Sequence, residues 1–244
     1  LEPLESIPLG VVQKALIIGG GVAGMVAAID LAKQGFETFI IEREEQLGGN
    51  LNRLHYSLYN EDIQEYLRKL IKTVRRTEQI KVFLKSEIKD ITGFVGNFKT
   101  IIRSLKDGKE FEIEHGVILV ATGAELTEPK EYLYGEDERV ITQLTLEELI
   151  SKSDNRLNEV NNVVMIQCVG SRDKERPYCS RICCAEAMKN AIKLKEQYPD
   201  VQIYVLYRDI RTYGFKEVLF EKARQMGIVF VRYDLDKKPR VLKE

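Results

Sequence analysis

A glycine-rich turn between an apolar strand and a helix is the feature that most constrains the fold of this chain. Residues 13–42, QKALIIGGGVAGMVAAIDLAKQGFETFIIE, predict a strand, a glycine turn, a helix and a second strand. The run ALII is short, continuous and apolar, as in the buried strands of parallel sheets. Gly19, Gly21 and Gly24 form G-x-G-x-x-G in the turn, and Glu42 ends the second strand. This arrangement predicts an α/β fold that binds a dinucleotide.

Each residue of the motif has a mechanical role in such a fold. Gly19 permits the tight turn, Gly21 lets the backbone approach a pyrophosphate, and Gly24 allows the helix to pack closely on the strand. The start of the helix offers free N–H groups and positive potential to the phosphates. The carboxylate at the end of the second strand accepts hydrogen bonds from ribose hydroxyls. The expected cofactor contacts here are Gly19, Gly21, Val22, Ala23, Gly24 and Glu42.

Two further small-residue turns favour FAD over NAD as the dinucleotide. In EREEQLGGN, residues 42–50, Arg43 lies beside the ribose acid, and a Gly-Gly pair offers backbone to the pyrophosphate and ring of a flavin. VATG, residues 120–123, ends a later apolar strand in a second small-residue turn. The additional expected FAD contacts are Arg43, Gly48, Gly49, Asn50, Ala121, Thr122 and Gly123.

The rest of the chain predicts a small meander and a second α/β unit. A helix is expected after its N-cap Asn60, and short strands, IKVFL first, follow between residues 80 and 116, with a hairpin turn at Asp107-Gly108. From Val163, strands and helices alternate again, which predicts a second parallel sheet. The fold class is α/β: a Rossmann-like FAD-binding domain with a small antiparallel meander, followed by a partial second Rossmann-like α/β domain. The expected divisions are an N-terminal segment at 1–12, the FAD-binding domain at 13–127, a connecting segment at 128–160 and a cysteine-bearing domain at 161–244.

All four cysteines lie in one short stretch, CVGSRDKERPYCSRICC, residues 168–184. A redox disulfide usually uses C-x-x-C, whereas three residues separate Cys179 from Cys183, and a disulfide between Cys183 and Cys184 would close a strained ring. Structural zinc favours two C-x2-4-C pairs and fits second best. An iron–sulfur cubane takes four thiolates at irregular spacings, so it suits C-x10-C-x3-C-C best.

The surroundings of the cysteines agree with an anionic cluster. Ser180 is the expected N-cap of a helix that ends near residue 197, which places Cys183 and Cys184 in the first turn, where the helix dipole stabilises anionic sulfur. Basic residues outnumber acidic ones between residues 172 and 181. The loop holds one glycine and no second G-x-G-x-x-G, so an ordinary nicotinamide site is not expected.

The order of these motifs resembles a known superfamily. Residues 13–123 resemble the thioredoxin-reductase-like flavoproteins with two dinucleotide-binding domains, in which the three small-residue segments contact FAD. CVGSRD, YCSRICC and the later YRDIRTYG further resemble the heterodisulfide reductase A family, iron–sulfur flavoproteins of methanogens and other anaerobes. The ferredoxin-type C-x2-C-x2-C-x3-C modules of that family, and the C-terminal G-D segment of its FAD domain, are absent from this sequence. The resemblance implies a [4Fe-4S] cluster bound by Cys168, Cys179, Cys183 and Cys184.

The resemblance also implies a function. The chain is expected to be an FAD- and iron–sulfur-dependent electron-transfer oxidoreductase, as one component or fragment of a heterodisulfide-reductase-A-like complex, without an acid–base catalytic residue. Its expected partners are other subunits, either ferredoxin-like or similar to the B-type and C-type components of heterodisulfide reductase, and a homodimer is considered as well. The alternatives are an NAD(P)H-dependent flavin disulfide reductase that uses Cys183 or Cys184, and a zinc-stabilised interaction domain without catalysis.

Composition sets the remaining limits. The formal net charge is -1, so no global field attracts nucleic acid or an anionic membrane. The most apolar stretch, residues 15–32, is interrupted by glycines and an aspartate, so no membrane span is expected. The few cysteines indicate a reducing compartment, and the cytoplasm is expected. Because the chain lacks an initiating Met, it is expected to be part of a longer polypeptide.

Overall fold

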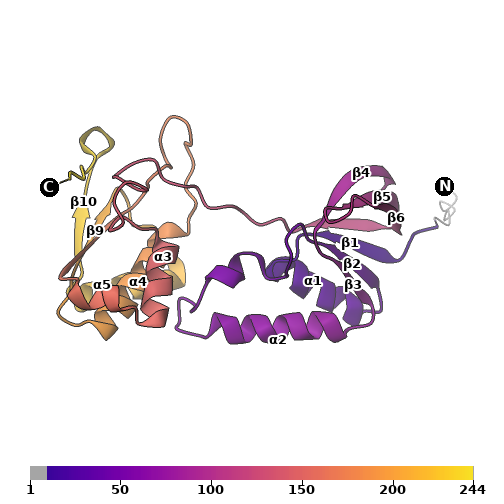
Figure 1. The fold of residues 1–244 in the computed structure, drawn as a ribbon, viewed down its shortest axis with the longest axis horizontal. Coiled ribbons are helices and arrows are strands. Elements are labelled where there is room, and N and C mark those ends of the chain that lie inside the picture. Colours follow the sequence, from indigo (N-terminus) through magenta and orange to yellow (C-terminus); the bar gives the residue numbers. More distant parts are fainter. Residues whose placement is uncertain (1–9, 244) are drawn as a thin grey trace, which may run out of the picture. The chain divides into compact units, whose positions relative to one another are not determined.

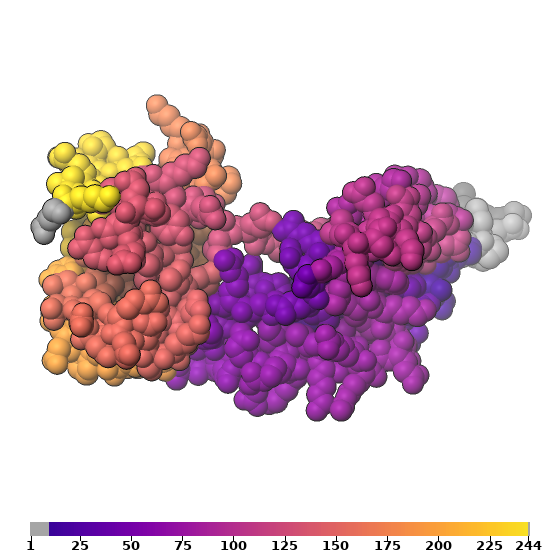
Figure 2. All heavy atoms as spheres, viewed as in Figure 1, coloured from indigo at the N-terminus to yellow at the C-terminus, as the bar shows by residue number. Residues whose placement is uncertain are grey.

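The chain folds into two compact units. A computed structural model describes residues 10–243, of which unit 1 takes 10–52 and 63–124, and unit 2 takes 53–62 and 125–243. Figure 1 shows the elements of each unit, and the yellow atoms in Figure 2 place the last described residues at the surface of unit 2. The backbone therefore runs from unit 1 to unit 2, back to unit 1, and again to unit 2. Most of the predicted N-terminal segment at 1–12 lies outside the described residues.

Unit 1 is built on a parallel sheet with helices on one face and a meander on the other (Figure 1). The strand order is β3-β2-β1-β7, and every neighbouring pair is parallel. The strands are β1 (Lys14–Ile18), β2 (Glu37–Ile41), β3 (Ile80–Phe83) and β7 (Val117–Val120), and the helices are α1 (Val22–Lys33) and α2 (Ile63–Arg76). The strand, turn, helix and strand predicted over residues 13–42 are confirmed.

The sheet of unit 1 packs on both faces, because successive side chains of a strand point to opposite sides. Ile17 packs with apolar residues of the two helices, including Met25 and Leu70. Its neighbour Leu16 packs on the opposite face with Ile102 of the meander. The glycine turn that follows β1 is therefore anchored to a strand buried between two layers.

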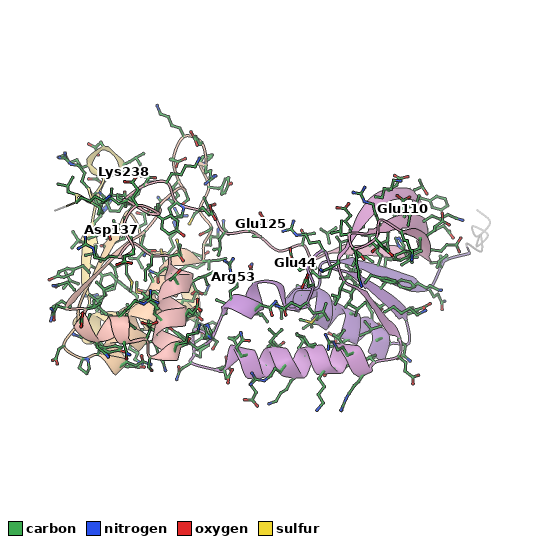
Figure 3. The ribbon with its side chains drawn as sticks, viewed as in Figure 1. Glu44, Arg53, Glu110, Glu125, Asp137 and Lys238 are labelled. Carbon is green, nitrogen blue, oxygen red and sulfur yellow. The ribbon has the colours of Figure 1, made fainter. Side chains whose placement is uncertain are left out.

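The antiparallel meander has the order β4-β5-β6, with β4 at Ser86–Phe94, β5 at Asn97–Ser104 and β6 at Glu110–His115. The predicted hairpin turn is confirmed: Gly108 has φ +71° and donates its N–H to the end of β5 at 2.9 Å. In Figure 3 Glu110 lies on this meander, where its carboxylate accepts a hydrogen bond from Lys89 at 2.7 Å. The expectation that Ile80 begins the meander is wrong, because β3 pairs in parallel with β2. The sequence pattern of a short apolar strand does not show which other strand it pairs with in a sheet.

Unit 2 contains the second parallel sheet that the sequence predicts. The strand order is β10-β9-β8, and both pairs are parallel. The strands are β8 (Asn162–Ile166), β9 (Gln202–Tyr207) and β10 (Val229–Arg232), and the helices are α3 (Gln143–Lys152), α4 (Cys183–Gln197) and α5 (Glu217–Gln225). Short 3-10 helices occur at Gly49–Arg53, Asn155–Glu159, Gly214–Lys216 and Leu235–Lys237. Across residues 10–243, no helix is both long and apolar enough to cross a membrane.

Helix α3 lies inside the stretch that was expected to be a connecting segment, 128–160. Leu146 and Ile150 are buried in the hydrophobic core of unit 2, one helical turn apart. Thr142 caps the helix, and its hydroxyl accepts a hydrogen bond from the N–H of Thr145 at 3.2 Å. This stretch is therefore part of unit 2, and its capping threonine and helical apolar spacing are the sequence signals that identify it.

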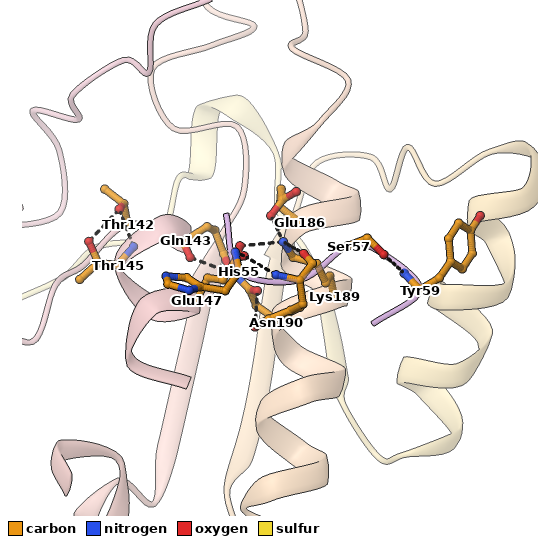
Figure 4. Close-up of polar contacts among 11 residues, drawn as sticks. His55, Ser57, Tyr59, Thr142, Gln143, Thr145, Glu147, Glu186, Lys189 and Asn190 are labelled. Atoms are coloured by element: carbon orange, nitrogen blue, oxygen red, sulfur yellow. Dashed lines mark hydrogen bonds and ion pairs between the residues drawn. The ribbon is translucent and has the colours of Figure 1, made fainter. Parts of the chain in front are cut away.

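Residues 53–62, here called the strap, leave unit 1 and pack in unit 2 (Figure 4). The N–H groups of His55 and Tyr56 donate to one carboxylate oxygen of Glu147, at 2.6 and 3.3 Å. The Lys189 ammonium donates to the other oxygen at 2.7 Å and to the carbonyl of Tyr56 at 3.3 Å. Glu147 and Lys189 are 0% and 5% exposed, so a buried ion pair holds the backbone of the strap.

The ring of Tyr56 anchors the strap in the core of unit 2. Its hydroxyl donates to the side-chain oxygen of Asn190 at 2.9 Å, and the Asn190 amide donates to the side chain of Gln143 at 2.8 Å. Burial, together with the charge of Glu147, raises the pKa of Tyr56, so the hydroxyl remains a donor. The strap, α3 and α4 are thus joined by one hydrogen-bonded network.

The end of the strap corrects the expected start of the second helix. Helix α2 begins at Ile63, so Asn60 is not its N-cap. Asn60 instead has φ +65° and accepts a hydrogen bond from Lys193 of α4 at 2.8 Å. Asparagine tolerates this left-handed conformation better than most residues, which explains its presence in a turn.

Candidate cofactor and metal site

The glycine turn of unit 1 leads directly into α1. Gly21 precedes the first helical residue, and no side chain caps the helix. Val22 and Ala23 are exposed, and the N–H groups of a helix's first turn have no partner within the helix. A Cβ added to Gly21 would meet no heavy atom within 4 Å. This end of α1 fits a pyrophosphate, which free N–H groups and the helix dipole attract.

Close backbone packing explains the other two glycines of the motif. A Cβ at Gly24 would lie 2.0 Å from the carbonyl oxygen of Gly19. A Cβ at Gly19 would lie 2.3 Å from the carbonyl oxygen of Ala121, and Gly19 has φ +109°. Both positions therefore require glycine, and the first turn touches the predicted ATG turn.

The three segments predicted to contact FAD come together in unit 1. The N–H of Gly48 donates to the carbonyl of Gly20 at 2.9 Å, which joins the Gly-Gly pair to the glycine turn. The amide of Asn50 donates to the carbonyl of Ala124 at 3.0 Å, which joins the same segment to the ATG turn. Three more of the predicted contacts are exposed: Gly49, Thr122 and Gly123. Their arrangement suits a dinucleotide, and FAD contact at each residue stays a prediction.

Glu42 directly follows the last residue of β2, which ends one position earlier than predicted, and its carboxylate is already fixed in place. One oxygen accepts the N–H of Gly20 at 2.7 Å, and the other accepts the N–H of Glu44 at 2.9 Å. A carboxylate has about four acceptor positions, so Glu42 keeps capacity for ribose hydroxyls. Arg43 is exposed and pairs with Glu44 at 3.3 Å. The side chain of Glu42 is thus held in one orientation, whereas the side chain of Arg43 lies at the surface.

The cysteine-bearing loop connects β8 to α4 in unit 2. Cys168, Arg172 and Arg181 have φ values of 63°, 58° and 61°. Side chains other than glycine adopt this conformation at a cost of about 1–3 kcal/mol each, and such residues cluster at functional sites. The strain therefore marks this loop as a candidate site independently of its cysteines.

The first turn of α4 contains two of the cysteines, as predicted, although the helix begins later than expected. Cys183 and Cys184 are its first residues. The expectation that Ser180 is the N-cap is wrong, because Ile182 occupies that position without a capping side chain. The side chain of Ser180 instead lies close enough to the sulfur of Cys183 to lower its pKa.

Cys168, Cys183 and Cys184 lie close together. The Cys184 thiol lowers the pKa of Cys183 to about 6, with further lowering from Ser180 and the backbone of Cys168. The Cys183 thiol, together with burial, raises the pKa of Cys184. These opposite shifts favour the anion on Cys183, at the N-terminus of α4, where the helix dipole stabilises it.

The fourth thiol has a different partner. The sulfur of Cys179 accepts the N–H of Arg181 at 3.3 Å. In the described part of the chain, no group of three or more His, Cys, Asp or Glu residues is arranged to hold a metal ion. Chemically the donor set fits an iron–sulfur cluster, since four thiols lie between the end of β8 and the first turn of α4 and three of them are neighbours. Ligation by all four cysteines stays a prediction.

The YRDIRTYG segment, which begins at the last residue of β9, also belongs to this site. The sulfur of Cys184 lies 3.8 Å from the carbonyl oxygen of Asp209. The guanidinium of Arg172 lies 3.7 Å from the sulfur of Cys168 and 2.5 Å from the Asp209 carboxylate. Sequence reasoning counted Arg172 only among the basic residues beside the expected anionic cluster, and it gave Asp209 no role of its own. The available signal was topological, because loops after neighbouring parallel strands meet at one edge of the sheet.

Comparison with known proteins decides the family. The pyridine nucleotide-disulphide oxidoreductase family matches residues 13–166, which is more than half of the chain. The chain belongs to this family. The solved structure of thioredoxin reductase from Lactococcus lactis resembles this chain, with a TM-score of 0.55 and 19% sequence identity. The match covers 93% of this chain and 68% of that one. The structure of the bacillithiol disulfide reductase of Bacillus cereus has a TM-score of 0.54 and 18% sequence identity, and the match covers 90% of this chain and 67% of that one. These two structures confirm the predicted fold class.

Curated relatives confirm the resemblance to heterodisulfide reductase. The chain is 30% identical over 323 residues to the A-type component of the H(2):CoB-CoM heterodisulfide,ferredoxin reductase of Methanothermobacter marburgensis, covering 95% of this chain and 49% of the relative. It is 29% identical to an A-type iron-sulfur component of the CoB-CoM heterodisulfide reductase of Methanopyrus kandleri, with the same coverage. The chain thus spans about half the length of these relatives. Since the matched length exceeds the 244 residues of this chain, the relatives carry residues inside the matched region that are missing here.

Proposed function

We propose that this chain binds FAD and a [4Fe-4S] cluster and transfers electrons as part of a heterodisulfide-reductase-A-like oxidoreductase. The observation that carries the proposal is the segment from the end of β8 to the first turn of α4, where three of four clustered thiols lie together and the loop backbone is strained. The open N-terminus of α1 in unit 1 supports FAD. Similarity to a relative whose name describes an iron-sulfur protein supports the cluster.

In this proposal the residues of unit 1 bind and orient FAD. The N–H groups at the start of α1 bind the pyrophosphate, and Glu42 accepts hydrogen bonds from the ribose. Gly48 and Gly49 let the backbone approach the flavin. FAD, when bound, supplies the chemistry that converts between electron pairs and single electrons.

The residues of unit 2 hold the cluster in this proposal. The proposed ligands are Cys168, Cys179, Cys183 and Cys184. The dipole of α4 and the guanidinium of Arg172 place positive potential beside the anionic sulfurs. A cluster bound here would supply one-electron transfer. Because Cys184 is buried, this side of the cluster would be shielded from solvent.

We propose partners of the same chemical class as those in the relatives' names. Ferredoxin occurs in the names of several relatives, so a ferredoxin-like protein is a proposed electron carrier for this chain. Proteins similar to the B-type and C-type components of heterodisulfide reductase are the other proposed partners. A homodimer and a cytoplasmic location stay predictions.

A visible spectrum and metal analysis of the anaerobically purified chain test this function against its alternatives. We expect flavin absorption together with iron and acid-labile sulfide. An NAD(P)H-dependent flavin disulfide reductase would show flavin that NAD(P)H bleaches, titratable thiols and no iron. A zinc-stabilised interaction domain would be colourless and contain stoichiometric zinc. Either of these results would overturn the proposal.

A further inference from the structure

Arg172 connects the cysteine-bearing loop to the loop that follows β9. Its Nη2 atom lies 2.5 Å from Oδ2 of Asp209, and its Nη1 atom lies 3.7 Å from Sγ of Cys168. The main-chain oxygen of Asp209 lies 3.8 Å from Sγ of Cys184. One ion pair thus links the first and the last cysteine of the stretch.

The backbones of the two loops reinforce this link. The carbonyl of Arg172 accepts a hydrogen bond from Nη1 of Arg208 at 2.7 Å, and the N–H of Arg172 donates to the carbonyl of Tyr178 at 3.2 Å. The side chain of Arg172 is only 16% exposed, and its backbone is left-handed, with φ +58°. A strained residue with this many partners is one that the surrounding structure fixes in place.

We propose that Arg172 and Asp209 form a clip that positions Cys168 and Cys184 as cluster ligands, and that the Arg172 guanidinium of this clip raises the reduction potential of the cluster. This inference rests on the function proposed above. Outer-shell partners orient metal ligands, and their loss typically costs about 10–100-fold in metal affinity. A cation beside an anionic cluster favours the reduced form, which carries one more negative charge. Both clip residues act through the cysteines, as positioning residues.

Three substitutions in the full chain separate the roles of the clip. Arg172→Gln removes the guanidinium, and Asp209→Asn removes its carboxylate partner. Arg172→Lys keeps the positive charge but loses the fork that contacts carboxylate and sulfur together. Asp154→Asn is the matched control, because Asp154 pairs with Arg156 at 3.0 Å in a different loop of unit 2.

The variants are reconstituted anaerobically with ferrous iron and sulfide, and cluster retention is measured by titration with an iron chelator. Arg172→Gln should lose its iron at a chelator concentration about tenfold lower than the wild type. Its midpoint potential, from a reductive titration followed by electron paramagnetic resonance, should be lower. The midpoint potential of Arg172→Lys should lie closer to the wild-type value than its iron retention does. Asp154→Asn should match the wild type in both measurements.

A second measurement needs no cluster. In the cofactor-free chain, trypsin should cut Asp209→Asn within residues 172–181 faster than it cuts the wild type or Asp154→Asn, because the clip no longer holds that loop. If the wild type takes up iron and Arg172→Gln equals it in iron retention and potential, the clip is refuted while the proposed function stands. If the wild type takes up no iron, the proposed function fails and the clip fails with it.

Discussion

The ammonium of Lys189 lies 2.7 Å from the carboxylate of Glu147, and both side chains are buried in unit 2. The same carboxylate accepts the N–H of His55, which is 92 positions away in the sequence. Burial of two charges is tolerated when they pair with each other and hydrogen bonds satisfy the remaining atoms. The strap is therefore part of the core of unit 2, and Tyr56 belongs to its hydrophobic cluster.

Lys189→Met should destabilise unit 2 strongly, because it leaves the charge of Glu147 buried without its partner. Breaking a buried ion pair in this way costs about 3–5 kcal/mol. Urea unfolding followed by circular dichroism measures the change in the free energy of unfolding. Lys152→Met, which removes an exposed ion pair with Glu148 on α3, is the control and should cost less than about 1 kcal/mol. Equal costs for the two variants would contradict this role of the buried pair.

Two alanine substitutions in the glycine turn should separate packing from cofactor binding. Gly24→Ala should lower the free energy of unfolding of unit 1 by about 1–3 kcal/mol, since its Cβ would collide with the carbonyl of Gly19. Gly21→Ala should leave the stability of the flavin-free chain unchanged, because its Cβ enters open space, but should weaken FAD binding. Thermal unfolding and a fluorescence titration with FAD measure the two effects. Wild-type affinity in Gly21→Ala would show that the turn is not the FAD site.

His115 should make the stability of unit 1 depend on pH. It is 0% exposed, with its ring nitrogens 2.7 Å from Oγ1 of Thr100 and 3.1 Å from the carbonyl of Val117. Burial lowers the pKa of His115 from its usual value of 6.5. Below about pH 6.5 the unfolded chain therefore binds more protons than the folded chain, and the free energy of unfolding should fall as the pH falls toward the folded-state pKa.

Urea unfolding across a pH series from about 5 to 7.5 measures this dependence on both sides of the usual histidine pKa. His115→Gln should flatten the slope of stability against pH for unit 1. His55→Gln leaves His115 in place and should retain the slope. An unchanged slope in His115→Gln would assign the dependence to another group.

Elements whose determinants are neighbours in the sequence could be predicted from it. The turn from β1 into α1 depends on glycines within six residues, and the turn at Asp107-Gly108 depends on the dipeptide itself. The strap could not be predicted in this way, because its partners Glu147 and Lys189 are remote in the sequence. Asn60 precedes a helical pattern and so suggested an N-cap, whereas in the structure its contact is with α4.

The same distinction applies to the candidate site. The convergence of the three FAD segments follows from strand order, because β1, β2 and β7 are parallel neighbours or next neighbours and their carboxyl ends share one edge. The contact between Arg172 and Asp209 depends on side-chain directions in two irregular loops, one of them with a left-handed backbone at Arg172. No local pattern encodes those directions, so this part of the site emerged only from the structure.

The ratio of iron to FAD in the anaerobically prepared chain tests the central claim most directly. The account predicts about four iron atoms and one FAD per chain, as a single cubane and a single dinucleotide site require. A variant with serine at Cys168, Cys179, Cys183 and Cys184 should keep the FAD and contain no iron. A reconstituted wild-type chain that holds FAD without iron, or a four-serine variant with unchanged iron, would contradict the account.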